Sequence, residues 1–177
     1  GSLAAEFERC VKAVGALASA SPATREFSLP AIRRVLGALA VGYPVYRSYA
    51  DQDGRPDADA EDFDHAMQMA RSQLSAADAA WLPLLDDWLG GEAPGAFDEP
   101  ERTLRLKAVT GFQQLTSPLA AKAPEQDDGT THLTERARVQ LARVDDHGVH
   151  RHLGRPSGRG HDEIRASLAA RFPGARA

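Results

Sequence analysis

The sequence predicts an all-α fold, a small helical bundle of about five helices followed by a weakly ordered C-terminal tail. Apolar residues recur at steps of three or four up to about residue 123, and no comparable alternating runs, typical of β-strands, occur there. Composition changes at the same point, because ten of the eleven aromatic residues precede it. A stretch poor in large apolar residues buries little surface against the entropy cost of ordering it. We therefore expect a helical domain at 3–123 and a polar tail, rich in His, Arg and Asp, at 124–177.

Serine, proline and glycine delimit the first two expected helices. The first begins at Leu3 and ends at the Ser-Pro pair at 21–22. The second is capped by the hydroxyl of Ser28, tolerates Pro30 in its first turn, and stops at Gly42. Their apolar positions are Leu3, Phe7, Cys10, Val14 and Leu17 in the first, and Ile32, Val35, Leu36 and Leu39 in the second.

Three further helices are expected before residue 118. The third spans about 57–73. The fourth opens at Ser75, where Ser75-Ala-Ala-Asp78 resembles a capping box, and closes at the Gly-Gly pair at 90–91. The fifth follows the loop at 92–100 and is interrupted by the Ser-Pro pair at 117–118. Their apolar positions are Phe63, Ala66, Met67, Ala70 and Leu74, then Trp81, Leu84, Leu85, Trp88 and Leu89, then Leu104, Ala108, Phe112 and Leu115.

The tail holds two shorter patterns. Residues 138–144 and 149–153 are compatible with a hairpin whose turn contains Gly148. Residues 162–172 are compatible with a short amphipathic helix that has Ile164, Leu168 and Phe172 on one face.

Charge and cysteine content exclude several classes of protein. With 21 basic and 25 acidic residues, the chain lacks the basic excess of a broad nucleic-acid interface. No apolar run approaches the roughly 20 residues of a membrane span, and the N-terminus lacks the basic-then-apolar order of a secretory signal. The single cysteine, Cys10, excludes an internal disulfide and is expected in the core. These features favour a cytoplasmic protein without nucleic-acid or membrane partners.

Two segments differ from ordinary helix composition. One is Gly42-Tyr-Pro-Val-Tyr-Arg-Ser-Tyr49, and the other is Gly111-Phe-Gln-Gln-Leu-Thr-Ser-Pro-Leu-Ala-Ala-Lys-Ala123. In this order they resemble maltooligosyltrehalose synthase, a glycoside-active enzyme of the family-13 type, which carries F-P-V-Y-R-T/S-Y and later R-F-Q-Q-x-T/S-x-P-x-x-A-K-G/A. The resemblance covers roughly residues 25–123 and extends to the intervening helices, which look like the helical insertion of that enzyme.

The chain also departs from this family pattern. Gly111 stands where the family has an arginine. The family continues after the lysine with V-E-D-T-A-F-Y-R-Y, whereas here Pro-Glu-Gln-Asp-Asp-Gly follows at 124–129. These differences suggest a truncated, spliced or degenerate member, and the sequence alone does not distinguish the three.

The resemblance implies a reaction in trehalose biosynthesis, the conversion of the reducing-end α-1,4 link of a maltooligosaccharide into an α,α-1,1 link. Retaining chemistry at an anomeric carbon uses one carboxylate as nucleophile and another carboxyl group as acid/base. In the family both lie on barrel strands that have no counterpart in this sequence. We therefore expect the chain to shape the maltooligosaccharide cleft, to be inactive alone and to use no cofactor, with the missing catalytic barrel as a partner.

Some residues of the chain are candidates for contact with the sugar. Amide and ammonium groups suit hydroxyl-rich ligands, and aromatic faces can stack on pyranose rings. The alternative is that the amides and the lysine are ordinary exposed groups, and we favour packing for the tyrosines at 43, 46 and 49. We favour core packing for the two tryptophans as well. The substrate-binding candidates are Gln113, Gln114, Lys122, Tyr46 and Arg47.

Two further interpretations concern the tail. Asp162 follows a histidine as the third, assisting carboxylate of the family does, although a charged helix start is the interpretation we favour. His147, His150 and His152 offer imidazole ligands for zinc or nickel beside two aspartates, although we favour a solvated polar tail. The rival hypothesis is thus a stand-alone helical interaction module whose tail binds a metal or a partner.

Overall fold

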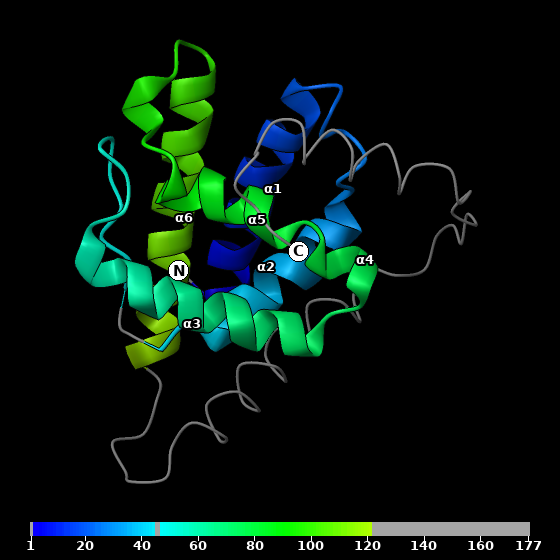
Figure 1. The fold of residues 1–177 in the computed structure, drawn as a ribbon, viewed down its shortest axis with the longest axis vertical. Helices are drawn as coiled ribbons and strands as arrows, with labels where there is room; N and C mark the ends of the chain where they lie inside the picture. The colour runs from blue at the N-terminus through cyan, green and yellow to red at the C-terminus, as the bar shows by residue number, and fades with distance from the viewer. Residues whose placement is uncertain (1, 45–46, 122–177) are drawn as a thin grey trace, which may run out of the picture.

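The computed structural model describes residues 2–44 and 47–121, which fold into helices and connecting loops (Figure 1). No β-strand occurs within these two ranges, so the predicted all-α fold is confirmed. The elements are α1 Leu3–Ala20, α2 Leu29–Gly42, α3 Asp57–Gln73, α4 Ala76–Ala79, α5 Leu82–Asp86, the π-helical turn η1 Asp87–Gly91, the 3₁₀ turn η2 Pro94–Ala96 and α6 Glu101–Ala121.

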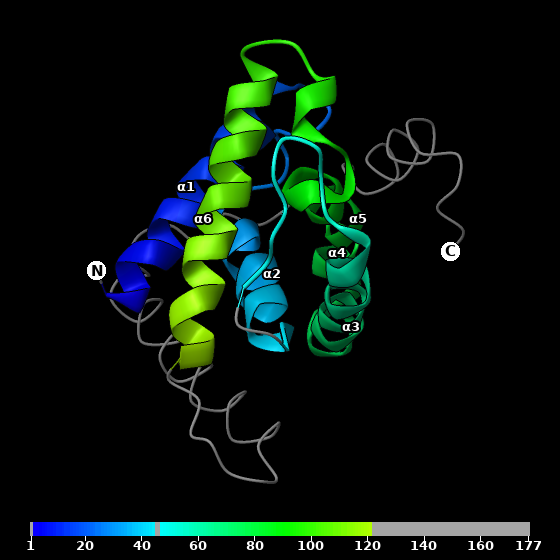
Figure 2. The ribbon, with the colours of Figure 1, turned by 90° about the vertical axis from the view of Figure 1, so that its left-hand side faces the viewer.

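The helices are arranged in layers around α2 (Figure 2). α1 and α6 pack against each other on one side of α2, and α3 with α4 and α5 lies on the other side. The first and last helices of the described chain therefore form one face of the bundle. None of the described helices is long and apolar enough to cross a membrane.

Most of the expected helix boundaries are confirmed. α1 ends just before Ser21, and α3 has the predicted bounds. The Ser28 hydroxyl accepts a hydrogen bond from the backbone N–H of Ala31 at 3.4 Å, and Pro30 lies in the first turn of α2. Gly90 has φ +111°, a conformation that favours glycine and ends the helical run there.

The prediction of one continuous fourth helix was wrong. The segment divides into α4, α5 and η1, because Pro83 has no N–H to continue the helical ladder from α4. Its start follows the prediction, since the Ser75 hydroxyl accepts from the N–H of Asp78 at 3.1 Å. The Asp78 carboxylate, however, accepts hydrogen bonds from the guanidinium of Arg34 at 2.7 and 2.9 Å. It therefore does not bond back to the N–H of Ser75, and the capping box is only half formed.

The predicted interruption of the fifth helix at residues 117–118 was also wrong. α6 continues through Pro118 to Ala121. Pro118 removes one backbone donor, the one that would bond the carbonyl of Gln114. The cost is one helical bond near the end of α6, and the helix continues for three more residues.

Two aromatic groups hold the layers together. Phe27 and Trp81 stack at 4.5 Å between ring centroids. Tyr43 meets Phe63 and Phe112 edge-on, at 6.1 and 5.5 Å. Trp81, Trp88 and Tyr43 are buried, so core packing is confirmed for both tryptophans and for this tyrosine.

Candidate functional site

The two sequence segments that carry the family resemblance lie against each other. Tyr43 of the first segment packs on Phe112 of the second. The side-chain amide of Gln113 donates a hydrogen bond to the carbonyl oxygen of Ala50, the residue that follows the first segment. Segments more than 60 positions apart therefore share one local structure, since this bond spans 63 positions.

The remaining predicted sugar contacts differ in accessibility. Arg47 and Gln114 are exposed. Gln113 is half-buried, and its side-chain N–H donates to the carbonyl of Ala50. Tyr49 is 58% exposed, and the Arg47 guanidinium carbon lies 5.1 Å from its ring centroid. Tyr46 and Lys122 lie outside the described residues, as do Asp162, His147, His150 and His152.

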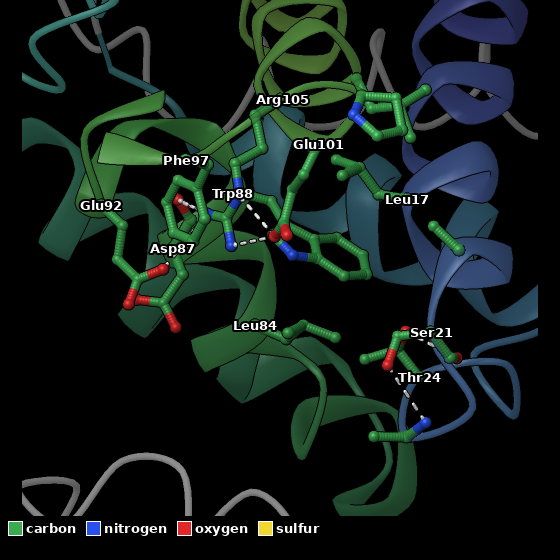
Figure 3. A pocket seen from close by; sticks show the side chains of 14 residues that line it. Leu17, Ser21, Thr24, Leu84, Asp87, Trp88, Glu92, Phe97, Glu101 and Arg105 are labelled. Carbon is green, nitrogen blue, oxygen red and sulfur yellow. Dashed lines mark hydrogen bonds and ion pairs between the residues drawn. The ribbon is translucent and has the colours of Figure 1, made fainter. Parts of the chain in front are cut away.

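A cavity of about 300 Å³ lies elsewhere, where the C-terminal end of α1 faces α5, η1 and the first turns of α6 (Figure 3). Its walls combine leucines, aromatic rings and charged groups. The lining includes Leu17, Ser21, Leu84, Asp87, Trp88, Glu92, Phe97, Glu101, Leu104 and Arg105.

Arg105 is the buried cation of this cavity. Its side chain is 4% exposed and forms ion pairs with Glu101 at 3.0 Å and Glu92 at 3.2 Å. It also donates to the backbone carbonyl of Asp87 at 3.4 Å, and its guanidinium carbon lies 3.6 Å from the ring centroid of Phe97. One arginine thus connects α6 to the segment that carries η1 and to the loop after it.

The carboxyl group of Asp87 is the perturbed acid of the site. Its pKa is raised to about 7, mainly by burial and also by the nearby carboxylates of Glu92 and Asp86, while Arg105 and Arg55 act in the opposite direction. The neighbouring carboxylate of Asp86 forms an ion pair with Arg55 at 2.7 Å. Asp87 therefore changes its charge near neutral pH.

Sequence reasoning did not identify this cavity. Asp87 follows Leu84 by three positions, a helical spacing that places a carboxyl at the edge of the apolar face. That pattern could have indicated a half-buried acid. The hydrogen bond from Arg105, 18 positions later, to the backbone carbonyl of Asp87 depends on how α6 packs and leaves no local signal.

Replacing Asp87 should stabilise the protein above neutral pH. Because its pKa is higher in the folded than in the unfolded chain, the free energy of unfolding falls as the pH rises from about 4 to about 7 and stays low above that. We expect Asp87→Asn, which cannot ionise, to raise the free energy of unfolding at about pH 8 by about 2 kcal/mol, with about 4 kcal/mol as the ceiling that a shift of three pKa units sets.

Urea unfolding at about pH 5 and pH 8 measures this difference. The matched control is Asp64→Asn, a change of the same kind at an exposed position of α3, for which we expect less than about 0.5 kcal/mol. A gain from Asp87→Asn that is the same at both pH values would contradict the assignment.

Metal and thiol chemistry find no support in the part of the chain that the structure describes. It contains no group of three or more His, Cys, Asp or Glu side chains arranged to hold a metal ion. Cys10 is fully buried, and burial raises the pKa of its thiol to about 12. A thiol so protonated is a poor nucleophile, which agrees with its expected place in the core.

Comparison with known proteins gives no relative for the chain, since neither a family model, nor a curated protein, nor a solved structure matches it.

Proposed function

We propose that the chain is the helical module of an enzyme of the maltooligosyltrehalose synthase type, and that one face of it borders the maltooligosaccharide cleft. The observation that carries the proposal is the contact between the two motif segments. Tyr43 packs on Phe112, and Gln113 bonds to Ala50. A contact of this kind is expected if the two motifs form one structural unit.

The face in question combines the groups that sugars recognise. Tyr49 and Gln114 are exposed, and each comes from one of the two motif segments. An exposed ring can stack on a pyranose, and an amide can both donate to and accept from its hydroxyls. The bond from Gln113 to Ala50 joins residues that are each one position from these two groups.

Turnover needs more than this face. A retaining transglycosylation uses two carboxyl groups about 5 Å apart on opposite sides of the scissile bond. In the proposed enzyme a catalytic barrel supplies them, and the helical module contributes substrate contacts. We therefore expect the chain alone to bind maltooligosaccharide weakly and not to convert it.

Titration of ¹⁵N-labelled protein with maltohexaose tests the proposal. We expect saturable shifts of the backbone amides of Arg47, Tyr49 and Gln114. Removing the ring in Tyr49→Ala should weaken binding about three- to tenfold, the size of one aromatic contact. Gln114→Ala should weaken it by a similar factor, since one hydrogen bond is worth about 1 kcal/mol.

The control for these variants is Gln68→Ala, which removes an exposed glutamine of α3 and should leave the affinity unchanged. A dispersed helical spectrum that does not respond to maltohexaose would overturn the proposal. Shifts that survive both Tyr49→Ala and Gln114→Ala would place the sugar on another face.

A further inference from the structure

The cavity between α1, η1 and α6 has walls that the proposed sugar face does not use. Its lining residues include none from the motif segments at 42–49 and 111–123. Apolar side chains form most of one wall, with Leu17 on α1, Leu84 and Trp88 on the α5–η1 segment and Leu104 on α6 (Figure 3). A volume of about 300 Å³ lies at the lower end of the range for small-molecule sites.

The charges around the cavity do not balance. Arg105 pairs with Glu101 and Glu92, and Asp86 pairs with Arg55. Among the described residues, the carboxyl group of Asp87 has no hydrogen bond or ion pair of its own. The cavity therefore carries more carboxylates than cations when Asp87 is ionised.

The end of α1 adds negative potential from the opposite side. Ala20 and Ser21, at its C-terminus, line the cavity, and its last turn contains no basic residue. The C-terminus of a helix carries a partial negative charge that favours cations. No charged side chain of α1 or of the loop after it lines the cavity to offset this.

We propose that this cavity binds a small organic monocation, an ammonium group on an apolar stem. The ammonium lies beside the Asp87 carboxylate and the stem packs against Leu84 and Trp88, while the C-terminal end of α1 lies on the opposite side of the cavity. A cation in this place supplies the partner that Asp87 lacks.

Binding is then coupled to a proton. Bound cation favours ionised Asp87, whose pKa in the free protein is about 7. The ionised fraction of such a group rises about thirtyfold between about pH 5.5 and about pH 8, which sets the largest gain in affinity that this coupling can give. The other charged groups around Asp87 are Asp86 and Glu92 on its own segment, Arg55 from the loop before α3, and Glu101 and Arg105 on α6.

Calorimetric titration of the full chain with phenethylammonium chloride tests the proposal, since this amine stays protonated over the range. We expect saturable one-site binding that strengthens at least about tenfold between about pH 5.5 and about pH 8. The neutral isostere 2-phenylethanol should bind at least about tenfold more weakly at the higher pH. Chemical shifts should locate the amine at Asp87 and Trp88.

Asp87→Asn separates binding from folding, because we expect this variant to be more stable than the parent chain. It should lose at least about tenfold in affinity and all of the pH dependence, while Asp64→Asn keeps both. Absence of binding, equal binding of alcohol and amine, or an unchanged affinity in Asp87→Asn would each overturn the proposal. So would maltohexaose shifting the cavity amides while the amine does not, which would make the occupant a sugar.

Discussion

Replacing Gly111 by arginine should destabilise the chain by more than about 4 kcal/mol, a loss reserved for severe overpacking or an unpaired buried charge. Gly111 is buried where α6 crosses α1. A Cβ at this position would lie 3.2 Å from the Cα of Cys10 and 3.5 Å from its Cβ and Sγ. The whole arginine side chain would then have to enter this contact with its charge desolvated.

Thermal unfolding measures this loss. We expect the midpoint of Gly111→Arg to fall by roughly 15 °C or more, or the cooperative transition to disappear. Thr110→Arg is the matched control, because Thr110 is exposed on the same helix and the change there should cost less than about 0.5 kcal/mol. Gly111→Ala should stay within about 1 kcal/mol of the parent, since the better helix propensity of alanine offsets a contact tighter than usual.

The Gly111→Arg variant tests the family resemblance as well as the packing of α1 on α6. The proposed family has an arginine where this chain has Gly111. If Gly111→Arg folds with the stability of the parent, α1 does not press on α6 at Cys10, and the departure from the family pattern is trivial. A large loss means that the packing of α1 on α6 in this chain requires the glycine.

Local sequence predicts some boundaries of this fold and misses others. Ser28 and Gly90 act through their own backbone neighbours, so the chain itself indicates where α2 begins and where η1 ends. Pro83 and Pro118 have the same local chemistry and opposite results. Pro83 divides the expected helix, whereas Pro118 lies inside α6. The local sequence does not distinguish the two cases, because tertiary packing overrides local preference.

The two candidate sites also differ in how far the local sequence indicates them. Residue types in two motifs indicated the candidates for sugar contact, and the bond between Gln113 and Ala50 shows that the two motif regions meet. The cavity could not be predicted from the sequence, because the pKa of Asp87 is set mainly by burial. Burial of a side chain at the edge of an apolar face depends on what covers that edge. Here it is the first turn of α6 and the end of α1.

Removing the guanidinium of Arg105 should have the second large effect, a loss of about 3 kcal/mol at about pH 8 in Arg105→Met. The methionine keeps an apolar side chain and leaves Glu92 and Glu101 without their buried partner. Both glutamates are more than one third exposed, so water replaces part of the lost interaction and the effect stays at the low end for a broken buried pair.

The pH dependence of this loss identifies its cause. Arg105 lowers the pKa of Asp87, so its removal raises that pKa further and makes the ionised carboxyl more costly. At about pH 5.5 Asp87 is protonated in both proteins, and the loss should shrink to about 2 kcal/mol. Arg71→Met, the same change at an exposed position of α3, should cost less than about 0.5 kcal/mol at either pH. An equal loss at both pH values would mean that Arg105 acts through its packing on Phe97 alone and that its charge does not reach Asp87.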